Sequence, residues 1–263
     1  MREALIGILL AGLLLVSGCS GGDPATPTAG SSTPSASAVA SSPPAPKPPQ
    51  NGKCYRLSFD EALAPIADDK TVKCRRRHTS QTFKVGRLDR GVEVDSARAQ
   101  RQAREGCRSR LGRFVGADRE ALRLSLLATV WFTPTLEEGA AGGRWFRCDV
   151  IATAGSNRLM QLPGELEGTL GEFALCTTAE PGRKDSRRVP CSGRHAWRAL
   201  ATVDLAGSSY PSVEKVADAM RETCRSRARS GADDALDFTW SEERPSHSQW
   251  KAGQRYGICW VPE

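Results

Sequence analysis

Two cysteine and histidine pairs at the same spacing are the residues best suited to chemistry. They are Cys74-x-x-x-His78 and Cys191-x-x-x-His195. Thiolate and imidazole are common zinc ligands, so each pair resembles half of a zinc site. Neither pair is close to a Cys-x-x-Cys partner. The eight cysteines that follow Cys19 are an even number, which favours disulfides in an oxidising compartment. We therefore expect no metal and no cofactor.

Side chains for other kinds of catalysis show no recognisable arrangement. No Gly-x-Ser-x-Gly presents a nucleophile, and Arg75 stands in the first pair where Ser192 stands in the second. Glu137-Glu138 and Glu242-Glu243 lie in predicted loops. Nothing there is expected to raise the pKa of one carboxyl group above that of the other, as an acid and base pair requires. The chain also lacks a phosphate-cradling glycine motif and a dinucleotide fingerprint. We predict that the protein is not an enzyme.

The two Cys-His segments belong to longer matching stretches. Residues 72–78 and 189–195 share Val, Cys, Arg and His at identical positions. Cys-Arg-Ser-Arg occurs at 107–110 and again at 224–227, 33 residues after the preceding cysteine in both cases. An earlier and a later cysteine complete the same order of four in each copy. The sequence therefore predicts two tandem copies of one small module, at residues 52–153 and 173–263.

The beginning of the chain has the features of an export signal. An apolar run from Ala4 to Val16 follows Arg2 and is too short to span a bilayer comfortably. The segment Val16-Ser17-Gly18-Cys19 resembles a bacterial lipobox, whose cysteine is acylated and becomes the new N-terminus; the alternative is an ordinary signal peptide with an incidental cysteine. We expect a signal peptide at 1–18, lipid (palmitate among the acyl chains) on Cys19, and a protein anchored on the outer face of the cytoplasmic membrane.

The next segment has the composition of a tether. Residues 19–51 consist mostly of Gly, Pro, Ala, Ser and Thr. Such a segment has too little apolar surface to offset its ordering entropy, so we predict that it is disordered. At about 3 Å for each residue it would reach up to ~100 Å from the membrane.

Eight cysteines remain after Cys19, four in each copy. Four cysteines allow three pairings in each module, and composition alone does not choose among them. Neighbouring strands can join the first two cysteines of a module, while a cysteine on the buried face of a helix can meet the last one. On this reasoning we predict the disulfides Cys54–Cys74, Cys107–Cys148, Cys176–Cys191 and Cys224–Cys259.

Helical periodicity is clearest before and around the third cysteine of each copy. A helix is predicted from an Asp95 or Ser96 cap to Phe114, and a second one over 211–229, with Cys107 and Cys224 on their apolar faces. Strands are predicted at 54–57, 81–88, 122–132, 145–151, 173–176, 195–203, 236–240 and 256–261. The fold class is α+β, with an antiparallel sheet and one packed helix in each disulfide-bonded module.

Residues 154–172 connect the modules and contain four leucines, which suggests a connector that lies on them. Two similar modules joined in this way would pack face to face about a pseudo-twofold axis, with a cleft between them. The first helix has a basic outer side. The candidate binding residues are Arg101, Arg104 and Arg108 on that side, and Arg77, His78, Arg194 and His195 beside the second cysteine of each module. The histidines either face a ligand or brace the loop next to a disulfide.

Several motifs together resemble the septum-formation family of exported or membrane-attached actinobacterial proteins. They are Gly52-Lys53-Cys54, Val-Pro-Cys-Ser-x-x-His at 189–195, Tyr210-Pro211, and Trp-x-x-Gly-x-Arg-x-x-x-Cys at 250–259. Members of that family usually have an acidic residue soon after the histidine, whereas this chain has Thr79 in one copy and Ala196-Trp197-Arg198 in the other. The resemblance implies a role in the cell envelope, with a link to septum formation or division.

The net charge of +7 narrows the choice of partner. Nucleic acid is excluded by the expected place outside the cell, so we expect an anionic cell-wall polymer, a lipid headgroup or an envelope protein. The leading hypothesis is a membrane-anchored, non-catalytic binding module of the cell envelope. The alternative is an exported ligand-sensing or structural domain that regulates a membrane partner. A wall binder should have an open arginine-rich face, and a sensor a closed apolar pocket between its modules.

Overall fold

A computed structural model describes residues 45–66, 70–155, 157–164, 166–168 and 170–263. The predicted signal peptide, Cys19 and most of the predicted tether lie outside these residues. Within the described part of the chain, no helix has both the length and the apolar character needed to cross a membrane. Below, the first half means residues 52–153 and the second half residues 173–263.

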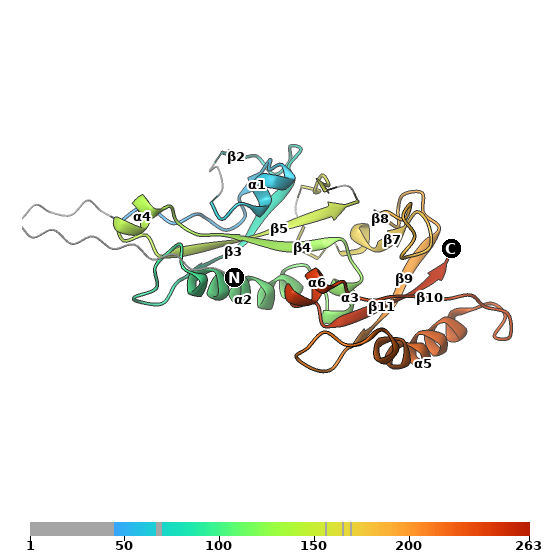
Figure 1. Cartoon of the computed structure of the whole chain (residues 1–263). Coiled ribbons are helices and arrows are strands. Elements are labelled where there is room, and N and C mark those ends of the chain that lie inside the picture. The colour runs from blue at the N-terminus through green and yellow to red at the C-terminus, as the bar shows by residue number, and fades with distance from the viewer. Residues whose placement is uncertain (1–44, 67–69, 156, 165, 169) are drawn as a thin grey trace, which may run out of the picture. The chain divides into compact units, whose positions relative to one another are not determined.

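The first half is an antiparallel sheet with one long helix. The strand order is β2-β1-β3-β5-β4, and β6 pairs with β5 beyond the half. Helix α2 (Ala97–Phe114) lies along one side of this sheet (Figure 1). The strands are β1 (Cys54–Tyr55), β2 (Thr71–Val72), β3 (Ser80–Arg87), β4 (Leu127–Phe132), β5 (Trp145–Ala154) and β6 (Arg158–Leu159).

The second half is built on a second antiparallel sheet, in the order β8-β7-β9-β11-β10, with helix α5 (Val213–Gly231) beside it (Figure 1). Its strands are β7 (Leu175–Thr177), β8 (Arg188–Pro190), β9 (Trp197–Asp204), β10 (Ser241–Glu243) and β11 (Tyr256–Pro262). Three strands, a long helix and two strands follow one another in both halves, and the strands occupy the same places in the two sheets. Both pairings of long strands also contain a β-bulge at the same point, which skips Phe83 in β3 and Leu200 in β9.

The eight described cysteines form four disulfides with the predicted pairing. In each half one bond joins the first strand to the segment just after the second strand, and the other joins the long helix to the last strand. Their Cα atoms are 5.0 to 5.3 Å apart, within the usual range for a disulfide. The bonds are Cys54–Cys74, Cys107–Cys148, Cys176–Cys191 and Cys224–Cys259.

Both long helices were predicted from sequence. The hydroxyl of Ser96 accepts a hydrogen bond from the Ala99 amide and caps α2, while Ser212 caps α5 through Lys215. Most of the apolar positions expected to face the sheet are buried, including Cys107 and Cys224, whereas Val213 in the first turn of α5 is 57% exposed. Short helices cover loops or sheet edges: α1 (Phe59–Leu63), α3 (Arg119–Arg123), α4 (Leu136–Ala140), α6 (His247–Lys251) and the 3-10 turn η1 (Leu170–Phe173).

Some strand predictions were wrong. Residues 236–240 form no strand, and the Leu236 side chain is 96% exposed; the strand β10 starts at Ser241. Strand β4 starts at Leu127 and not at residue 122, because α3 occupies the preceding residues. The short strands β2 and β8 were not predicted, since each is only two or three residues long and carries no alternating apolar pattern.

The two halves share their largest hydrophobic core. It contains Leu111 and Val115 from the end of α2, the connector leucines Leu162 and Leu166, and Trp260 of β11. The connector therefore lies on the halves as predicted. Hydrogen bonds join the halves beside this core: the Leu126 amide donates to the Phe173 carbonyl (2.8 Å), and the Leu175 amide donates to the Leu124 carbonyl (2.9 Å).

The halves meet through different faces. On β11, Ile258 and Trp260 point away from α5 into the shared core, whereas Cys259 points toward α5. On β5, Val150 is in the shared core and lies on the same side of its strand as Cys148, which is bonded to α2. The helix-free face of the second sheet thus packs on the helix-bearing side of the first. The face-to-face, pseudo-twofold packing expected from sequence is not formed.

Candidate functional site

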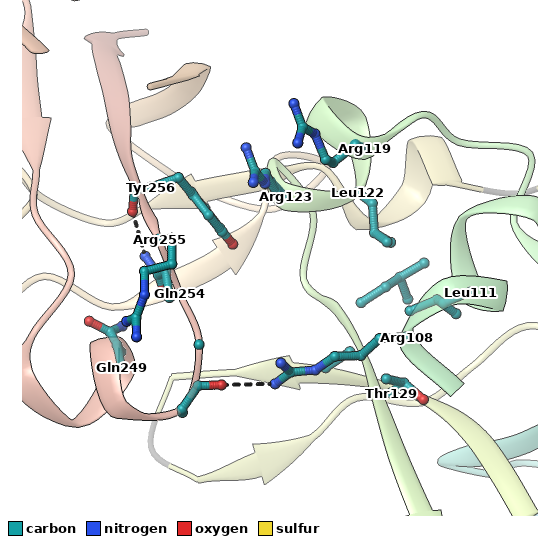
Figure 2. Close-up of a pocket in the computed structure, with 14 residues that line it drawn as sticks. Arg108, Leu111, Arg119, Leu122, Arg123, Thr129, Gln249, Gln254, Arg255 and Tyr256 are labelled. Atoms are coloured by element: carbon teal, nitrogen blue, oxygen red, sulfur yellow. Dashed lines mark hydrogen bonds between the residues drawn. The ribbon is translucent and has the colours of Figure 1, made fainter. Parts of the chain in front are cut away.

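A groove of about 490 Å³ lies between the two halves. One wall comes from α2 and α3, and the other from the segment 249–256 that runs from α6 into β11 (Figure 2). Leu111 and Leu127 are buried beneath it. Its lining includes four arginines, Arg108, Arg119, Arg123 and Arg255. Among the described residues, no carboxylate lines it.

Arg108 is held in the groove by the framework of the first half. The preceding residue, Cys107, is bonded to Cys148 of β5, which fixes the turn of α2 that carries the arginine. The Arg108 guanidinium donates to the Ala252 carbonyl of the opposite wall at 3.2 Å (Figure 2). Burial, together with the neighbouring charge of Arg104, lowers the pKa of Arg108. A guanidinium stays protonated at neutral pH even so.

Arg119 and Arg123 lie one helical turn apart on α3 and reach the same carboxylate. Asp204, at the end of β9, is 3.2 Å from the Arg119 guanidinium and 2.6 Å from that of Arg123. Arg123 also lies over the ring of Tyr256, 4.2 Å from its centroid. One carboxylate thus neutralises one of two guanidinium charges, and this wall keeps an excess of positive charge.

The opposite wall contributes a phenol and a further guanidinium. Burial raises the pKa of Tyr256, against the opposing effect of the Arg123 charge, so its hydroxyl is protonated at neutral pH. Among the described residues this hydroxyl has no hydrogen-bond partner. Arg255 lies 3.9 Å over the ring of Trp250 and donates to the Trp250 carbonyl. Figure 2 shows Arg255 across the groove from Arg119 and Arg123.

The candidate residues predicted from sequence lie in three places. Arg108 lines the groove, and Arg104 lines an adjoining hollow of about 650 Å³ that also includes Lys251. Arg101 is exposed one turn earlier on α2 and lines neither of them. The Arg-His segments of the two halves are elsewhere, and no residue of either segment lines the groove.

The two candidate histidines brace their own loops. Nδ1 of His78 lies 2.8 Å from the carbonyl of Arg76, and Nδ1 of His195 lies 2.7 Å from the carbonyl of Gly193, two residues earlier in both cases. His78 is 0% exposed and its carbonyl accepts a hydrogen bond from the Leu162 amide of the connector. Arg77 beside it is exposed. A fully buried imidazole does not present itself to a polymer, so the pair does not form two equivalent exposed sites.

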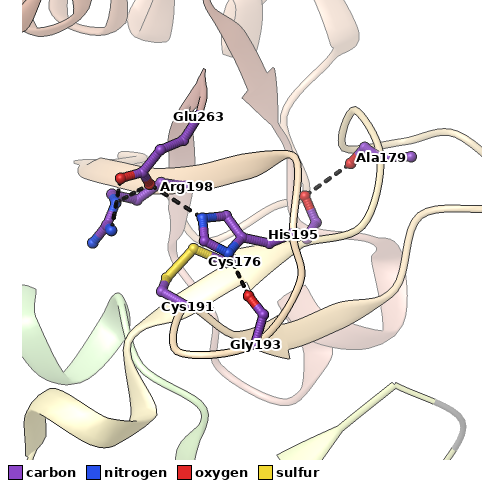
Figure 3. The surroundings of a disulfide bond; sticks show 8 residues. Cys176, Ala179, Cys191, Gly193, His195, Arg198 and Glu263 are labelled. Carbon is purple, nitrogen blue, oxygen red and sulfur yellow. Dashed lines mark hydrogen bonds and ion pairs between the residues drawn. A yellow bond between two sulfur atoms is a disulfide. The ribbon is translucent and has the colours of Figure 1, made fainter.

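His195 differs from His78 because its side chain is partly exposed (16%); it lies beside the Cys176–Cys191 disulfide (Figure 3). Its Nε2 is 3.4 Å from a carboxylate oxygen of Glu263, which is also paired with Arg198. Hydrogen bonding from Arg198 lowers the pKa of Glu263. The sulfur of Cys176 is near both groups, but a disulfide sulfur is not a thiolate and does not supply a zinc ligand. Arg194 next to it is exposed.

A buried ion pair in the first half was missed in the sequence. Arg147 and Asp149 of β5 are both 0% exposed, with the Arg147 Nε 3.1 Å from an Asp149 oxygen. Ser80 and Thr82 of β3 donate to the same carboxylate, each at 2.7 Å. Burial raises the pKa of Asp149, and the Arg147 charge opposes that rise. No solvent reaches these side chains, so the cluster belongs to the core and not to a binding site.

Sequence reasoning also missed most of the groove. Arg119 and Arg123 are at helical spacing, four residues apart, and Arg255 is the arginine of the Trp-x-x-Gly-x-Arg motif at 250–259. These signals were present. What the sequence does not contain is the packing that brings residues 119–123 and 249–256 to opposite walls.

The fold and the groove define a disulfide-bonded α+β protein with a basic groove between two halves of similar topology. The chain belongs to the septum-formation family: the family model described as "Septum formation" matches residues 51–259, which include both halves. Comparison with curated proteins and with solved structures finds no match.

Proposed function

We propose that this protein is a membrane-anchored, extracytoplasmic lipoprotein whose folded part is a non-catalytic binding module for anionic components of the cell envelope. The family match suggests a role related to division. The partner would be an anionic wall polymer, a lipid headgroup or an acidic face of an envelope protein, and not nucleic acid.

The arginine-lined groove is the observation that carries this proposal. It collects four guanidinium groups from two halves of the chain and opens beside Arg104 and Lys251. Clustered arginines bind phosphate and carboxylate groups well, since the planar fork forms paired charge-assisted hydrogen bonds. A closed apolar pocket would favour the alternative, a ligand-sensing or structural domain that regulates a membrane partner. The arginines along the groove favour the binder.

The anchoring part of the proposal rests on residues outside the described part of the chain. Cys19 would carry the lipid after removal of residues 1–18, and the tether up to residue 51 would hold the folded part away from the membrane. Cys19→Ser should leave unprocessed precursor or release the protein from membranes. Normal processing, acylation and retention of this variant, followed by fractionation and mass spectrometry, would rule out the lipobox.

We further propose that the halves are tandem copies of one module, at 52–153 and 173–263, with the connector at 154–172. The shared strand order, the equivalent bulges and the matching disulfides support a duplication. The copies have since diverged. The second sheet packs on the first through its helix-free face, whereas the helix-free face of the first sheet contains the buried ion pair.

Two experiments test the binding proposal: a salt titration, and removal of arginine charges from α2. Exposed charges are screened within about 8 Å at physiological ionic strength, so association with isolated wall polymers should weaken steeply as salt rises. The triple change Arg101→Gln, Arg104→Gln and Arg108→Gln should weaken it strongly and leave the melting temperature nearly unchanged. Equal retention of this variant in a wall pull-down would contradict the proposal.

The second helix offers a matched control. Arg221→Gln, Arg225→Gln and Arg227→Gln remove the same charge from exposed positions of α5 that do not line the groove. If both triple variants lose the same amount of wall association, binding depends on net charge alone.

A further inference from the structure

We propose that the groove between the halves is a discrete site for a phosphorylated sugar, that is, a hexose that carries a phosphate ester or phosphodiester. This inference rests on the proposed function and narrows the ligand of the same site. It needs a groove of suitable size, unpaired positive charge within it, and polar and apolar groups placed for a sugar ring.

The size of the groove suits a small ligand unit. Its volume of about 490 Å³ lies within the range of roughly 300–1,000 Å³ that is typical of small-molecule sites. Because α2 and α3 form one wall and residues 249–256 form the other, a bound unit would contact both halves at once (Figure 2). An exposed basic helix face would instead follow a polymer along its length.

The charge in the groove is largely without a counter-ion. Asp204 is shared by Arg119 and Arg123. Within the described part of the chain, Arg108 and Arg255 contact no carboxylate, and each donates only to a neutral backbone carbonyl. Burial and then the neighbouring Arg104 charge lower the pKa of Arg108. A phosphate would relieve this repulsion, and its oxygens suit guanidinium groups on more than one wall.

The remaining lining alternates apolar and polar groups. Leu111, Leu122 and Leu127 offer an apolar floor for the C–H face of a sugar ring. The Tyr256 hydroxyl has no partner among the described residues and can bond to a ring hydroxyl.

Two glutamines on the same wall have one end engaged and one end available. The Gln249 carbonyl oxygen accepts from the Ser246 amide, which leaves its NH₂ group to donate. The Gln254 NH₂ group donates to the Tyr256 carbonyl, which leaves its side-chain oxygen to accept. The Gln254 amide donates to the Gln249 carbonyl (2.9 Å), so the two residues are neighbours and the same wall offers both a donor and an acceptor for sugar hydroxyls.

The test is calorimetric titration of the purified full chain with N-acetylglucosamine 1-phosphate, with N-acetylglucosamine and inorganic phosphate as separate probes. The sugar phosphate should bind at least 10-fold more tightly than either probe alone. Arg108→Gln should weaken it at least 10-fold, and Tyr256→Phe several-fold. The control is Arg225→Gln, which changes the arginine at the same place in the repeated Cys-Arg-Ser-Arg segment but lies outside the groove; it should bind like the parent protein.

Three results would overturn the inference: no binding of the sugar phosphate, equally tight binding of inorganic phosphate, or an equal loss in Arg108→Gln and Arg225→Gln. Glucuronic acid serves as a carboxylate probe, and tighter binding of it than of the sugar phosphate would also overturn the choice of phosphate. Preserved disulfides and circular dichroism in each variant show that the loss is not one of folding.

A phosphorylated sugar occurs both in phosphodiester-linked polysaccharides and in lipid headgroups. Displacement of the bound probe by soluble polysaccharide fragments would identify the first source, and displacement by vesicles of a lipid with a hexose phosphate headgroup the second. The inference fails alone if wall association depends on the arginines of α2 while the sugar phosphate does not bind. The proposed function fails alone if the sugar phosphate binds in the groove while envelope material does not associate.

Discussion

The two halves place different chemistry on the same framework. In the first half, the side of the sheet opposite α2 contains Arg147 and Asp149, with Ser80 and Thr82 beside them. The residues at the same places in the second sheet are Ile258, Trp260, Trp197 and Ala199, which belong to the shared core. One half buries an ion pair where the other buries tryptophan and isoleucine.

This difference shows which features determine the topology and which side chains merely pack on the sheet. The strand order, the bulge and the disulfide between the long helix and the last strand are the same in both halves. They tolerate either a polar or an apolar filling on the other side of the sheet. In the second half the apolar filling lets the sheet pack on its neighbour, which places the wall of residues 249–256 across from α2 and α3.

The largest effect that would test this comparison is loss of one partner from the buried ion pair. Asp149→Ala would remove the Asp149 carboxylate from beside the buried Arg147 charge, and should lower the free energy of unfolding by about 3–5 kcal/mol. Replacing both residues by apolar ones, as Arg147→Met with Asp149→Leu, should cost much less, because it brings the site closer to the filling of the second half. Urea unfolding of both variants measures this. A double variant as unstable as the single one would show that the cluster is required and not merely tolerated.

Removal of one helix-to-strand disulfide at a time should show that the framework is equivalent in the two halves. The bonds Cys107–Cys148 and Cys224–Cys259 close loops of 41 and 35 residues. In the chain-entropy model each contributes roughly 4 kcal/mol. Paired Cys→Ala variants should therefore lose nearly equal stability in urea unfolding. If one variant lost several times more free energy of unfolding than the other, the two disulfides would not be equivalent in the two halves.

The histidines should separate the halves by burial. His78→Ala removes a fully buried side chain and its hydrogen bond to the Arg76 carbonyl, so we expect a loss of about 1–3 kcal/mol. His195→Ala removes a partly buried side chain whose partner Glu263 is exposed, and should lose only about 1 kcal/mol. Thermal unfolding measures both, and neither variant should alter binding of N-acetylglucosamine 1-phosphate. A change in binding with His195→Ala alone would restore that loop as part of a site.

The smallest expected effect concerns Glu263 and acid. Its pKa is lower in the folded protein than in the unfolded chain, because Arg198 and His195 stabilise its charged form. Its contribution is therefore present above the ordinary carboxyl pKa and is lost as the pH falls through the lowered value. Glu263→Gln should slightly reduce the loss of melting temperature between about pH 5 and pH 3.

Glu242 of β10 is the matched control for this measurement. Burial raises its pKa, so its contribution is present below the ordinary carboxyl pKa and is lost as the pH rises through the raised value. Glu242→Gln should change the pH profile with the opposite sign. Identical profiles for the two variants would contradict the assignment of either shift.

The long helices and the disulfides could be predicted because short-range sequence patterns indicate them. Cys107 and Cys224 lie among apolar residues at helical spacing, so both helices and both helix-to-strand disulfides could be predicted. Residues 236–240 also have a strand-like composition, yet Leu236 is exposed, because neighbouring β10 and not this segment pairs with β11. Composition indicates a preference, and pairing partners decide between adjacent segments.

The groove and the ion pair depended on packing over long sequence separations. The chain contains Arg147 and Asp149 two residues apart, which places both on one side of a strand. Nothing local shows that this side is buried. The 3.2 Å contact between Arg108 and the Ala252 carbonyl joins residues that are 144 positions apart. Arg104 and Arg108 were therefore predicted as an open basic face, whereas Arg108 lies in a walled groove.

The position of that second wall in the chain affects biosynthesis. Ribosomes synthesise a protein from its N-terminus to its C-terminus, so N-terminal elements are made before C-terminal ones. The arginines of α2 and α3 are made early, but the groove is completed only when residues 249–256 arrive, near the end of translation. A product truncated before Gln249 would keep a basic helix and lack the opposing wall. Binding at the proposed site would thus report that the chain has been synthesised through Tyr256.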